Sequence, residues 1–272
     1  MKRIRLLLEY DGTPFSGWQI QPGRDTVQER LETALAEVLG EKVRVHGAGR
    51  TDAGVHAWGQ VAHFDTRSDL PPPAIRAGCN RILPAAVAVL AAEAAPEGFH
   101  SRYHALGKRY RYLILIGRPI SPLRRSRAWL RPAALDAGAM RKASRPLLGK
   151  HDFTAFAGAG RPLRNGIRTL SRLDVEEDGE LLAVEIEGSG FLYRMVRNIV
   201  GTLAEVGRGK MPASRVEEIL RSRERTQAGP TAPPNGLYLV SVSYPFPVFG
   251  EKMICPSRSD LLTFPLDSAR EC

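Results

Sequence analysis

One turn-forming pair constrains the fold of this chain more than any other local feature. Asp178-Gly179 lies between two strand-like runs in RTLSRLDVEEDGELLAVEIEG, residues 168–188. An Asp-Gly pair flanked by such runs is typical of a β-hairpin, because these residues tolerate the positive φ angles of a tight two-residue turn. The chain therefore contains antiparallel strands, which argues against a doubly wound parallel sheet.

Strand-like and helix-like segments follow one another in mixed order along the chain. The clearest helix covers 25–40, because Thr26 and Glu29 form a capping-box pattern and Gly40 follows the last apolar position. Apolar periodicity predicts further helices over 71–83, 131–149, 191–207 and 213–224. Strands are predicted over 3–12, 42–50, 60–66, 87–95 and 108–117, with a last strand within 229–245.

This order predicts an α+β architecture with a largely antiparallel sheet. Each half of the chain contains a strand-helix-strand core of similar size. We expect an N-terminal α/β domain over 1–105 and a C-terminal α/β domain over 106–250. Residues 251–272 lack periodicity and are expected to form a loosely held tail.

The charge of the chain points to a polyanionic partner. The 272 residues carry a net charge of +10, with a sequence pI of about 9.9. Nucleic acid is the first candidate and an anionic membrane surface the second, although a generally basic proteome gives the same composition. No apolar run reaches the ~18 residues of a transmembrane helix, and the start MKRIRLLLEYDG lacks a signal peptide's apolar region. Three distant Cys argue against a disulfide framework, so a reducing cytoplasm is expected.

A glycine-rich stretch, HGAGRTDAGVHAWGQVAHF at 46–64, contains a single mid-loop carboxylate, Asp52. Glycines at 47, 49 and 54 allow the backbone to approach a ligand closely. Arg50, two residues earlier, favours the ionised form of a nearby carboxylate, which suits a nucleophile or a charge-stabilising group. The alternative is that Asp52 caps a turn and Arg50 is solvated.

The same stretch contains three histidines, but their spacing does not favour a metal site. His46, His56 and His63 show no i, i+4 helical pair, and no Cys lies near them. His63 falls in a strand pattern, where a structural role is expected. We therefore expect no metal ion.

Basic and aromatic residues alternate in KRYRY, residues 108–112. On a strand, Tyr110 and Tyr112 share one face and Arg109 and Arg111 the other. Strands that present aromatic rings for stacking and Arg for phosphates are common in RNA-binding proteins. The alternative is an edge strand whose Tyr side chains pack in the core.

The predicted helix in FLYRMVRNIVGTLAEVG carries Arg194 and Arg197, which would be neighbours near its positive N-terminal end. The alternative is a core helix with two surface Arg. The chain contains no GxxxxGK[ST], GxGxxG or GxSxG motif, so a kinase, a dehydrogenase and a serine hydrolase are not favoured.

Taken together, these stretches resemble the tRNA pseudouridine synthase A (TruA) family. GAGRTDAGVHAWGQVAHF, KRYRY, HDFTAF, FLYRMVRNIVGTLAEVG and PTAPPNGLYL occur in the family's order and spacing, and the opening LEYDGTPFSGWQIQP is similar too. The resemblance covers about residues 3–245, and GRTDAGVHA is highly specific to the family.

The resemblance implies a pseudouridine synthase fold, in which two α/β domains share a continuous mixed, mostly antiparallel sheet with flanking helices. It implies an isomerase without cofactor or metal that converts uridine to pseudouridine at positions 38, 39 and 40 of the tRNA anticodon stem-loop. The expected assembly is a cytoplasmic homodimer in which each tRNA contacts both subunits.

Carried over by motif, the resemblance gives roles to five residues. Asp52 is the catalytic aspartate, Tyr110 lies against the target uracil, Arg197 pairs with Asp52, Arg50 helps to displace the target base, and Leu237 lines the pocket. Arg194 stands where the family pattern also accepts His, and contact with RNA is expected there. Two alternatives stay open: a non-catalytic RNA-binding protein on the same scaffold, and a pseudouridine synthase that acts on other RNA.

Overall fold

The computed structural model describes residues 1–117, 122, 124–160 and 165–249. In these residues ten strands form one sheet, with the order β4-β1-β3-β10-β5-β9-β8-β7, β2 on β3 and β6 on β5. Only the β10–β3 and β5–β6 pairs are parallel. The predicted α+β fold with a mixed, mostly antiparallel sheet is confirmed. The predicted tail over 251–272 lies outside the described residues.

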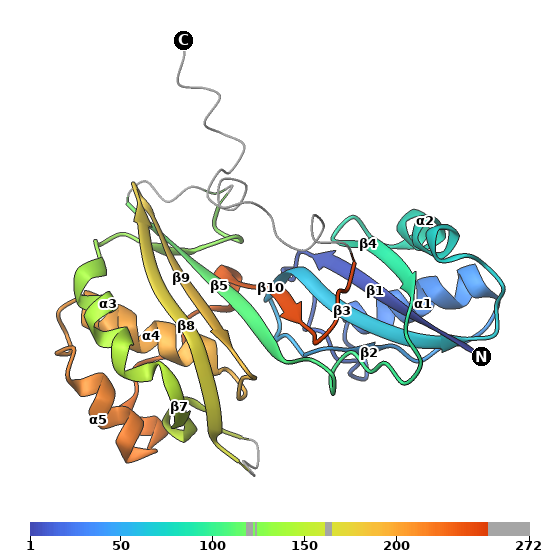
Figure 1. The fold of residues 1–272 in the computed structure, drawn as a ribbon. Helices are drawn as coiled ribbons and strands as arrows, with labels where there is room; N and C mark the ends of the chain where they lie inside the picture. Colours follow the sequence, from blue (N-terminus) through green and yellow to red (C-terminus); the bar gives the residue numbers. More distant parts are fainter. Residues whose placement is uncertain (118–121, 123, 161–164, 250–272) are drawn as a thin grey trace.

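The N-terminal half contributes four strands and two helices, which lie on the right in Figure 1. Thr26 caps the first helix, because its Oγ1 accepts a hydrogen bond from the Glu29 amide, and Gly40 ends the helix with a φ of 69°. The elements are β1 (Lys2–Tyr10), α1 (Val27–Leu39), β2 (His46–Gly47), β3 (His56–Thr66), α2 (Pro72–Ile82) and β4 (Val87–Ala94).

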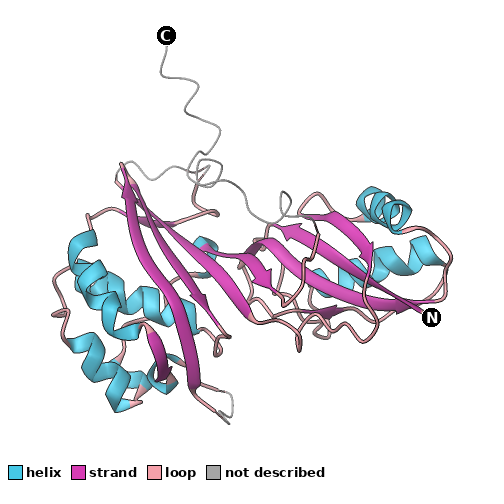
Figure 2. Ribbon diagram, in the orientation of Figure 1, coloured by secondary structure: helices cyan, strands magenta, loops and turns pink. Residues whose placement is uncertain are grey.

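The C-terminal half places its helices on one face of its strands (Figure 2). The predicted hairpin is confirmed, and Asp178 pairs with Leu181, so the loop residues are Gly179, with a φ of 56°, and Glu180. The elements are β5 (Gly107–Ile116), β6 (Trp129–Arg131), α3 (Ala137–Ser144), β7 (Gly149–Asp152), β8 (Ile167–Asp178), β9 (Leu181–Gly188), α4 (Met195–Gly207), α5 (Arg215–Ser222) and β10 (Leu237–Ser243).

The strand predicted over 42–50 was too long, because only His46–Gly47 forms β2, and two predicted helices also depart clearly from their predicted bounds. The helix expected to end at Gly149 stops at Ser144, and a short 3₁₀ turn that contains Pro146 follows. The helix expected from residue 191 begins at Met195, because Arg194 has a φ of 56° and cannot continue a right-handed helix.

Strand β10 joins the two halves of the sheet (Figure 1). Tyr238 pairs with His56 of β3, and Leu237 pairs with Tyr112 of β5. Nearly every residue of helix α4 is buried. The neighbouring segment packs so closely that a Cβ added at Gly201 would lie 1.7 Å from the Pro230 carbonyl oxygen. Helix α4 is thus a core helix, but the alternative of a core helix with two surface Arg does not hold, because Arg197 is 9% exposed and Arg194 precedes the helix. In the part of the chain that the structure describes, no helix has the length and apolar composition needed to cross a bilayer.

Candidate active site in the cleft between the two halves

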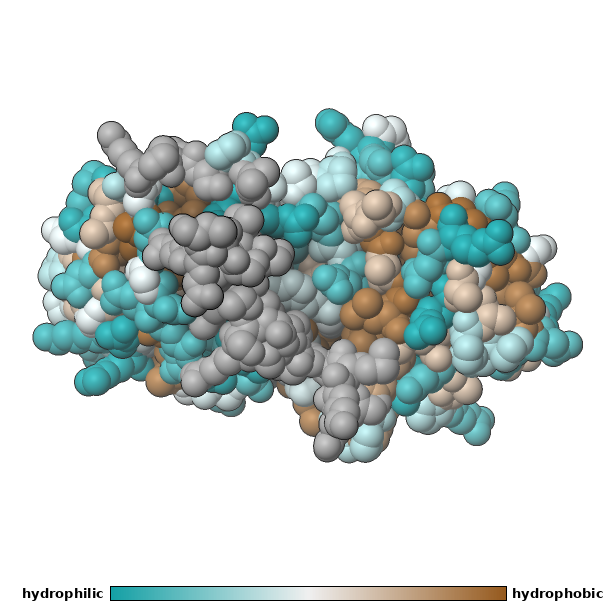
Figure 3. Space-filling view, turned by 90° about the horizontal axis from the view of Figure 1, so that it is seen from above, coloured by the Kyte–Doolittle hydropathy of each residue, from teal (hydrophilic) through white to brown (hydrophobic). Residues whose placement is uncertain are grey.

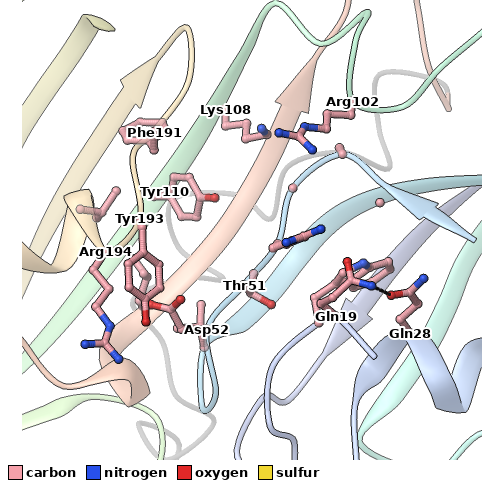
Figure 4. A pocket seen from close by; sticks show the side chains of 18 of the residues that line it. Gln19, Gln28, Thr51, Asp52, Arg102, Lys108, Tyr110, Phe191, Tyr193 and Arg194 are labelled. Atoms are coloured by element: carbon pink, nitrogen blue, oxygen red, sulfur yellow. Dashed lines mark hydrogen bonds between the residues drawn. The ribbon is translucent and has the colours of Figure 1, made fainter. Parts of the chain in front are cut away.

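A cleft of about 910 Å³ lies where the two halves meet. Its walls come from the 44–55 segment, Tyr110 of β5, the 191–197 segment and Leu237 of β10. Figure 4 shows that side chains from both halves of the chain face this cleft. The site therefore depends on the joint that β10 makes between the halves.

Asp52 and Arg197 form an ion pair in the cleft. Arg197 Nη1 lies 2.9 Å from Asp52 Oδ2, and the Arg197 Nε donates to the Ala232 carbonyl oxygen at 2.8 Å. The Asp52 side chain is 25% exposed and the Arg197 side chain 11%. The carboxylate is thus fixed on one side and open to the cleft on the other.

The loop that carries Asp52 is held by buried contacts behind it. The Tyr10 hydroxyl lies 2.9 Å from Thr51 Oγ1, and the Trp18 amide donates to the Thr51 carbonyl oxygen at 3.1 Å. The Gln60 side-chain Nε2 donates to the Gly49 carbonyl oxygen at 2.8 Å. A Cβ added at Gly12 would lie 2.0 Å from the Val55 oxygen, so the opening segment packs directly against the loop.

Tyr110 presents its ring to the cleft from β5. It is 8% exposed, and Phe191 packs edge-on against it with ring centroids 5.0 Å apart. Burial raises the pKa of Tyr110 well above 10, with smaller contributions from Tyr10 and Asp52. The side chain is therefore a protonated phenol at neutral pH.

Leu237 and Arg50 complete the set that the sequence motifs indicated. Leu237 is 6% exposed and lines the cleft where β10 begins. Arg50 lines the same cleft and is exposed. All five motif residues, which are separated by up to 187 positions, thus share one cleft.

Three residues of KRYRY, namely Arg109, Arg111 and Tyr112, do not serve the cleft as the RNA-binding pattern suggests. Arg111 is 1% exposed and pairs with Glu185, and Arg109 pairs with the same carboxylate. Tyr112 is fully buried, and its hydroxyl donates to the Pro233 carbonyl oxygen at 2.7 Å. Contact of Arg111 with phosphate is excluded by its burial. Tyr112 packs in the core as the alternative expected, but the edge strand was wrong, because β5 lies between β10 and β9.

The histidines of the glycine-rich stretch divide into two groups. His46 and His63 stack with ring centroids 5.1 Å apart, whereas His56 accepts a hydrogen bond from the Gly12 amide at its Nδ1. Burial lowers the pKa of His63 to about 4, with help from His100 and Arg3, so His63 is neutral and structural. Among the described residues, no group of three or more His, Cys, Asp or Glu is arranged to hold a metal ion.

Sequence reasoning missed several residues that line the cleft. Lys108 lies over the glycine-rich loop, because a Cβ added at Gly49 would be 3.2 Å from Lys108 Cε. Arg194, for which the sequence did predict contact with RNA, lies at the N-cap of α4 and stacks its guanidinium over Tyr193 at 4.8 Å from the ring centroid. The signal for Lys108 was its place at the start of KRYRY, beside the recognised Tyr110. No local signal marks the loop conformation of residues 191–194.

Comparisons with known proteins agree with this geometry. A family profile described as tRNA pseudouridine synthase matches residues 7–104 and 143–245. Two relatives named tRNA pseudouridine synthase A are 48% identical over 244 residues (Geobacter sulfurreducens) and 49% identical over 245 residues (Myxococcus xanthus). The alignments cover 90% of this chain and 100% and 92% of the relatives. A solved H/ACA ribonucleoprotein with a substrate RNA containing 2′-deoxyuridine matches at 12% identity and a TM-score of 0.31, over 76% of this chain and 54% of that chain.

Proposed function

Because the chain belongs to the tRNA pseudouridine synthase family and is an isomerase of tRNA uridine, we propose that it acts on positions 38, 39 and 40 of the anticodon stem-loop with Asp52 as its catalytic carboxylate. The observation that carries this proposal is the Asp52–Arg197 ion pair in a cleft that also presents Tyr110 and Leu237. A carboxylate held by one cation and open on its other side is suited to meet a developing charge at a sugar or base.

The reaction conserves atoms and electrons. The bond between ribose C1′ and uracil N1 breaks, the uracil rotates within the cleft, and a bond from C1′ to C5 forms. The hydrogen of C5 leaves as a proton, and N1 gains a proton. Asp52 is placed to attack the ribose, to attack the ring, or to remove a ribose proton, and each route begins from the ionised carboxylate that Arg197 holds.

The remaining motif residues are assigned to positioning. Tyr110 packs its ring on the uracil, and because its phenol is protonated at neutral pH, a water accepts the C5 proton. Leu237 closes the pocket around the base, and the exposed Arg50 takes the place of the target base when that base leaves its stack. These roles keep the detached uracil close to the ribose until the new bond forms.

The partner is tRNA, and the net charge of +10 favours binding of its phosphates. We further propose that the chain acts as a homodimer in the cytoplasm, where tRNA substrates occur. An apolar area over the N-terminal half, on the right of Figure 3, supports self-association. Sedimentation of the free protein as a monomer at all concentrations would contradict the dimer.

Tritium release tests the proposed reaction, since the C5 hydrogen must leave when pseudouridine forms. The substrate is unmodified tRNA labelled at C5 of uridine, and the proteins are wild type, Asp52→Asn and the control Asp178→Asn in the β8–β9 turn. We expect release by wild type and by the control, and none by Asp52→Asn, although Asp52→Asn still binds tRNA. Equal release by Asp52→Asn would remove Asp52 from the chemistry. Release that persists after positions 38 to 40 are changed to cytidine would place the reaction elsewhere in the tRNA.

A further inference from the structure

Tyr103 is an exposed aromatic side chain beside the cleft. It is 76% exposed and lines the cleft, and it is the sole aromatic residue among the exposed large hydrophobic residues of the described ranges. Its ring lies on His100 with centroids 4.2 Å apart and planes 30° from parallel. The His100 imidazole thus covers one face of the Tyr103 ring, and most of the Tyr103 side chain remains open to solvent.

The imidazoles of His63 and His46 pack against His100 and so support the Tyr103–His100 pair. His100 packs edge-on against His63 at 4.6 Å, and His63 stacks on His46 at 5.1 Å. His100 Nδ1 accepts hydrogen bonds from the amides of Arg102 and Tyr103, which places the proton of the neutral ring on Nε2. Burial lowers the pKa of His100, as do His46, Arg3, His104 and Arg102, which favours the neutral form.

The loop of residues 99–104 is anchored, so its side chains are positioned in advance. Ser101 Oγ donates to the His46 carbonyl oxygen at 2.6 Å, and the Ser101 amide donates to His63 Nδ1 at 3.2 Å. The Tyr244 hydroxyl donates to the Ser101 carbonyl oxygen at 2.6 Å. A pre-organised aromatic surface binds with a smaller loss of conformational entropy than a mobile one.

Two cations lie beside this aromatic surface. Figure 4 shows the ends of Lys108 and Arg102 pointing toward one another, on the other side of the cleft from Asp52 and Arg194. Burial lowers the pKa of Lys108, and so do Arg102 and Arg168. Within the described ranges, neither Lys108 nor Arg102 forms an ion pair with a carboxylate. An anion between the two would relieve their mutual repulsion.

We propose that this side of the cleft is a second nucleotide subsite, in which Tyr103 and His100 stack on an RNA base and Lys108 and Arg102 hold its phosphate. The subsite rests on the proposed function, and the nucleotide is one that neighbours the target uridine. The cleft volume of about 910 Å³ exceeds what a single uridine fills. Stacking on an aromatic ring tolerates every base, which suits an enzyme that acts at adjacent positions in different tRNAs.

Binding of a fluorescein-labelled RNA hairpin with an anticodon stem-loop sequence tests the stacking. All proteins carry Asp52→Asn, so that no product forms. We expect Tyr103→Ala to weaken binding by about 5- to 150-fold, the usual loss for one base–aromatic stack, and Tyr103→Phe to bind like its parent. Leu106→Ala is the matched control, because Leu106 is 59% exposed and lies outside the cleft lining.

The salt dependence of hairpin binding tests the phosphate contact. We expect Lys108→Gln to reduce the slope of log Kd against log salt by about 0.7 to 0.9, the change for one phosphate contact. Lys142→Gln, at an exposed position of α3, leaves the slope unchanged. Thermal melting of each variant separates loss of contact from loss of fold.

A fluorescent base then locates the stacked nucleotide. We expect 2-aminopurine at one position next to the target to change its emission on binding, with the change lost in Tyr103→Ala and retained in Tyr103→Phe. If Tyr103→Ala and Lys108→Gln bind like their controls, the subsite is overturned, and tritium release by wild type still establishes the reaction. If wild type releases no tritium but Tyr103→Ala binds the hairpin weakly, the proposed reaction fails and the subsite stands. A change in oligomeric state in Tyr103→Ala, without loss of RNA affinity, assigns Tyr103 to a protein interface and overturns the subsite.

Discussion

Arg197 Nη1 lies 2.9 Å from Asp52 Oδ2, although the two residues are 145 positions apart. Asp52 belongs to the loop before β3, and Arg197 to the first turn of α4. Each half of the chain thus supplies one partner, and the ion pair forms only when both halves of the sheet are assembled. The second bond of Arg197, from Nε to the Ala232 carbonyl oxygen at 2.8 Å, fixes the guanidinium on the segment that leads to β10.

Arg197→Lys is expected to lower kcat more than it raises KM. An ammonium group cannot bond the carboxylate and the Ala232 carbonyl oxygen in the same geometry, so Asp52 loses its fixed orientation. Loss of one charge-assisted bond costs about 1.5–3 kcal/mol, which corresponds to roughly 10- to 150-fold in kcat. Tritium-release kinetics measure kcat and KM. Arg208→Gln, which breaks an exposed pair with Glu205 at the end of the same helix, is the control, and a loss confined to KM would contradict the prediction.

Gly12→Ala is expected to destabilise the protein and to impair catalysis together. The new Cβ would lie 2.0 Å from the backbone oxygen of Val55. Because the atoms it meets are backbone and not the end of a flexible side chain, the Asp52 loop must shift. Such overpacking costs typically about 1–3 kcal/mol. Thermal denaturation and tritium release measure the two effects. Gly190→Ala, whose Cβ would meet only the Arg168 side chain at 3.8 Å, should melt like wild type.

The elements of the fold were largely predictable, because their signals are local. The cap at Thr26, the stop at Gly40 and the hairpin near Gly179 each follow from residues close in sequence. The insertion of β10 between β3 and β5 had no such signal, since its partners lie more than a hundred positions away. The predicted start of α4 was wrong, because Phe191 and Leu192 continue the apolar period. Apolar periodicity does not reveal the positive φ that Arg194 adopts.

The candidate site was predictable only in part, because some of its residues have local sequence signals and others depend on contacts between distant segments. Asp52 stood out by its glycine-rich loop, but its pairing with Arg197 came from the family resemblance and not from spacing. The alternation in KRYRY correctly separated Tyr110 from Arg109 on opposite faces of β5. It could not show that Glu185, on the neighbouring strand β9, pairs with the Arg side chains. Cross-strand partners depend on strand register, which a single sequence does not specify.

His63→Asn is expected to reduce the loss of stability on acidification between about pH 6.5 and pH 4. The pKa of His63 is lowered from 6.5 to about 4 in the folded protein, so the unfolded chain binds more protons in this range. The stabilisation is therefore present above pH 6.5 and is lost as the pH falls, with a magnitude on the order of 3 kcal/mol for a group that is 2% exposed.

Urea denaturation of wild type and His63→Asn at pH 7, 6, 5 and 4 measures this difference. Asn retains an acceptor near Nδ1 for the Ser101 amide, so the variant is expected to fold. His151→Asn, which makes the same substitution on β7, is measured beside it as the matched variant. Parallel pH profiles for wild type and His63→Asn would show that the carboxylates alone cause acid destabilisation.

Glu185→Gln is expected to be among the most destabilising single changes in the sheet. Glu185 is 1% exposed and pairs with Arg109, Arg111 and Arg172, and Arg111 is itself buried. Removal of the carboxylate charge takes from the buried Arg111 the anion it pairs with, which costs about 3–5 kcal/mol when a buried pair is broken. Urea denaturation measures the loss, and Glu218→Gln, which breaks an exposed pair with Arg215, should cost less than about 1 kcal/mol. A comparably small loss in Glu185→Gln would mean that the Arg109 and Arg172 side chains reach solvent without Glu185, and the contact of Arg109 with RNA phosphate that KRYRY suggested would again be open.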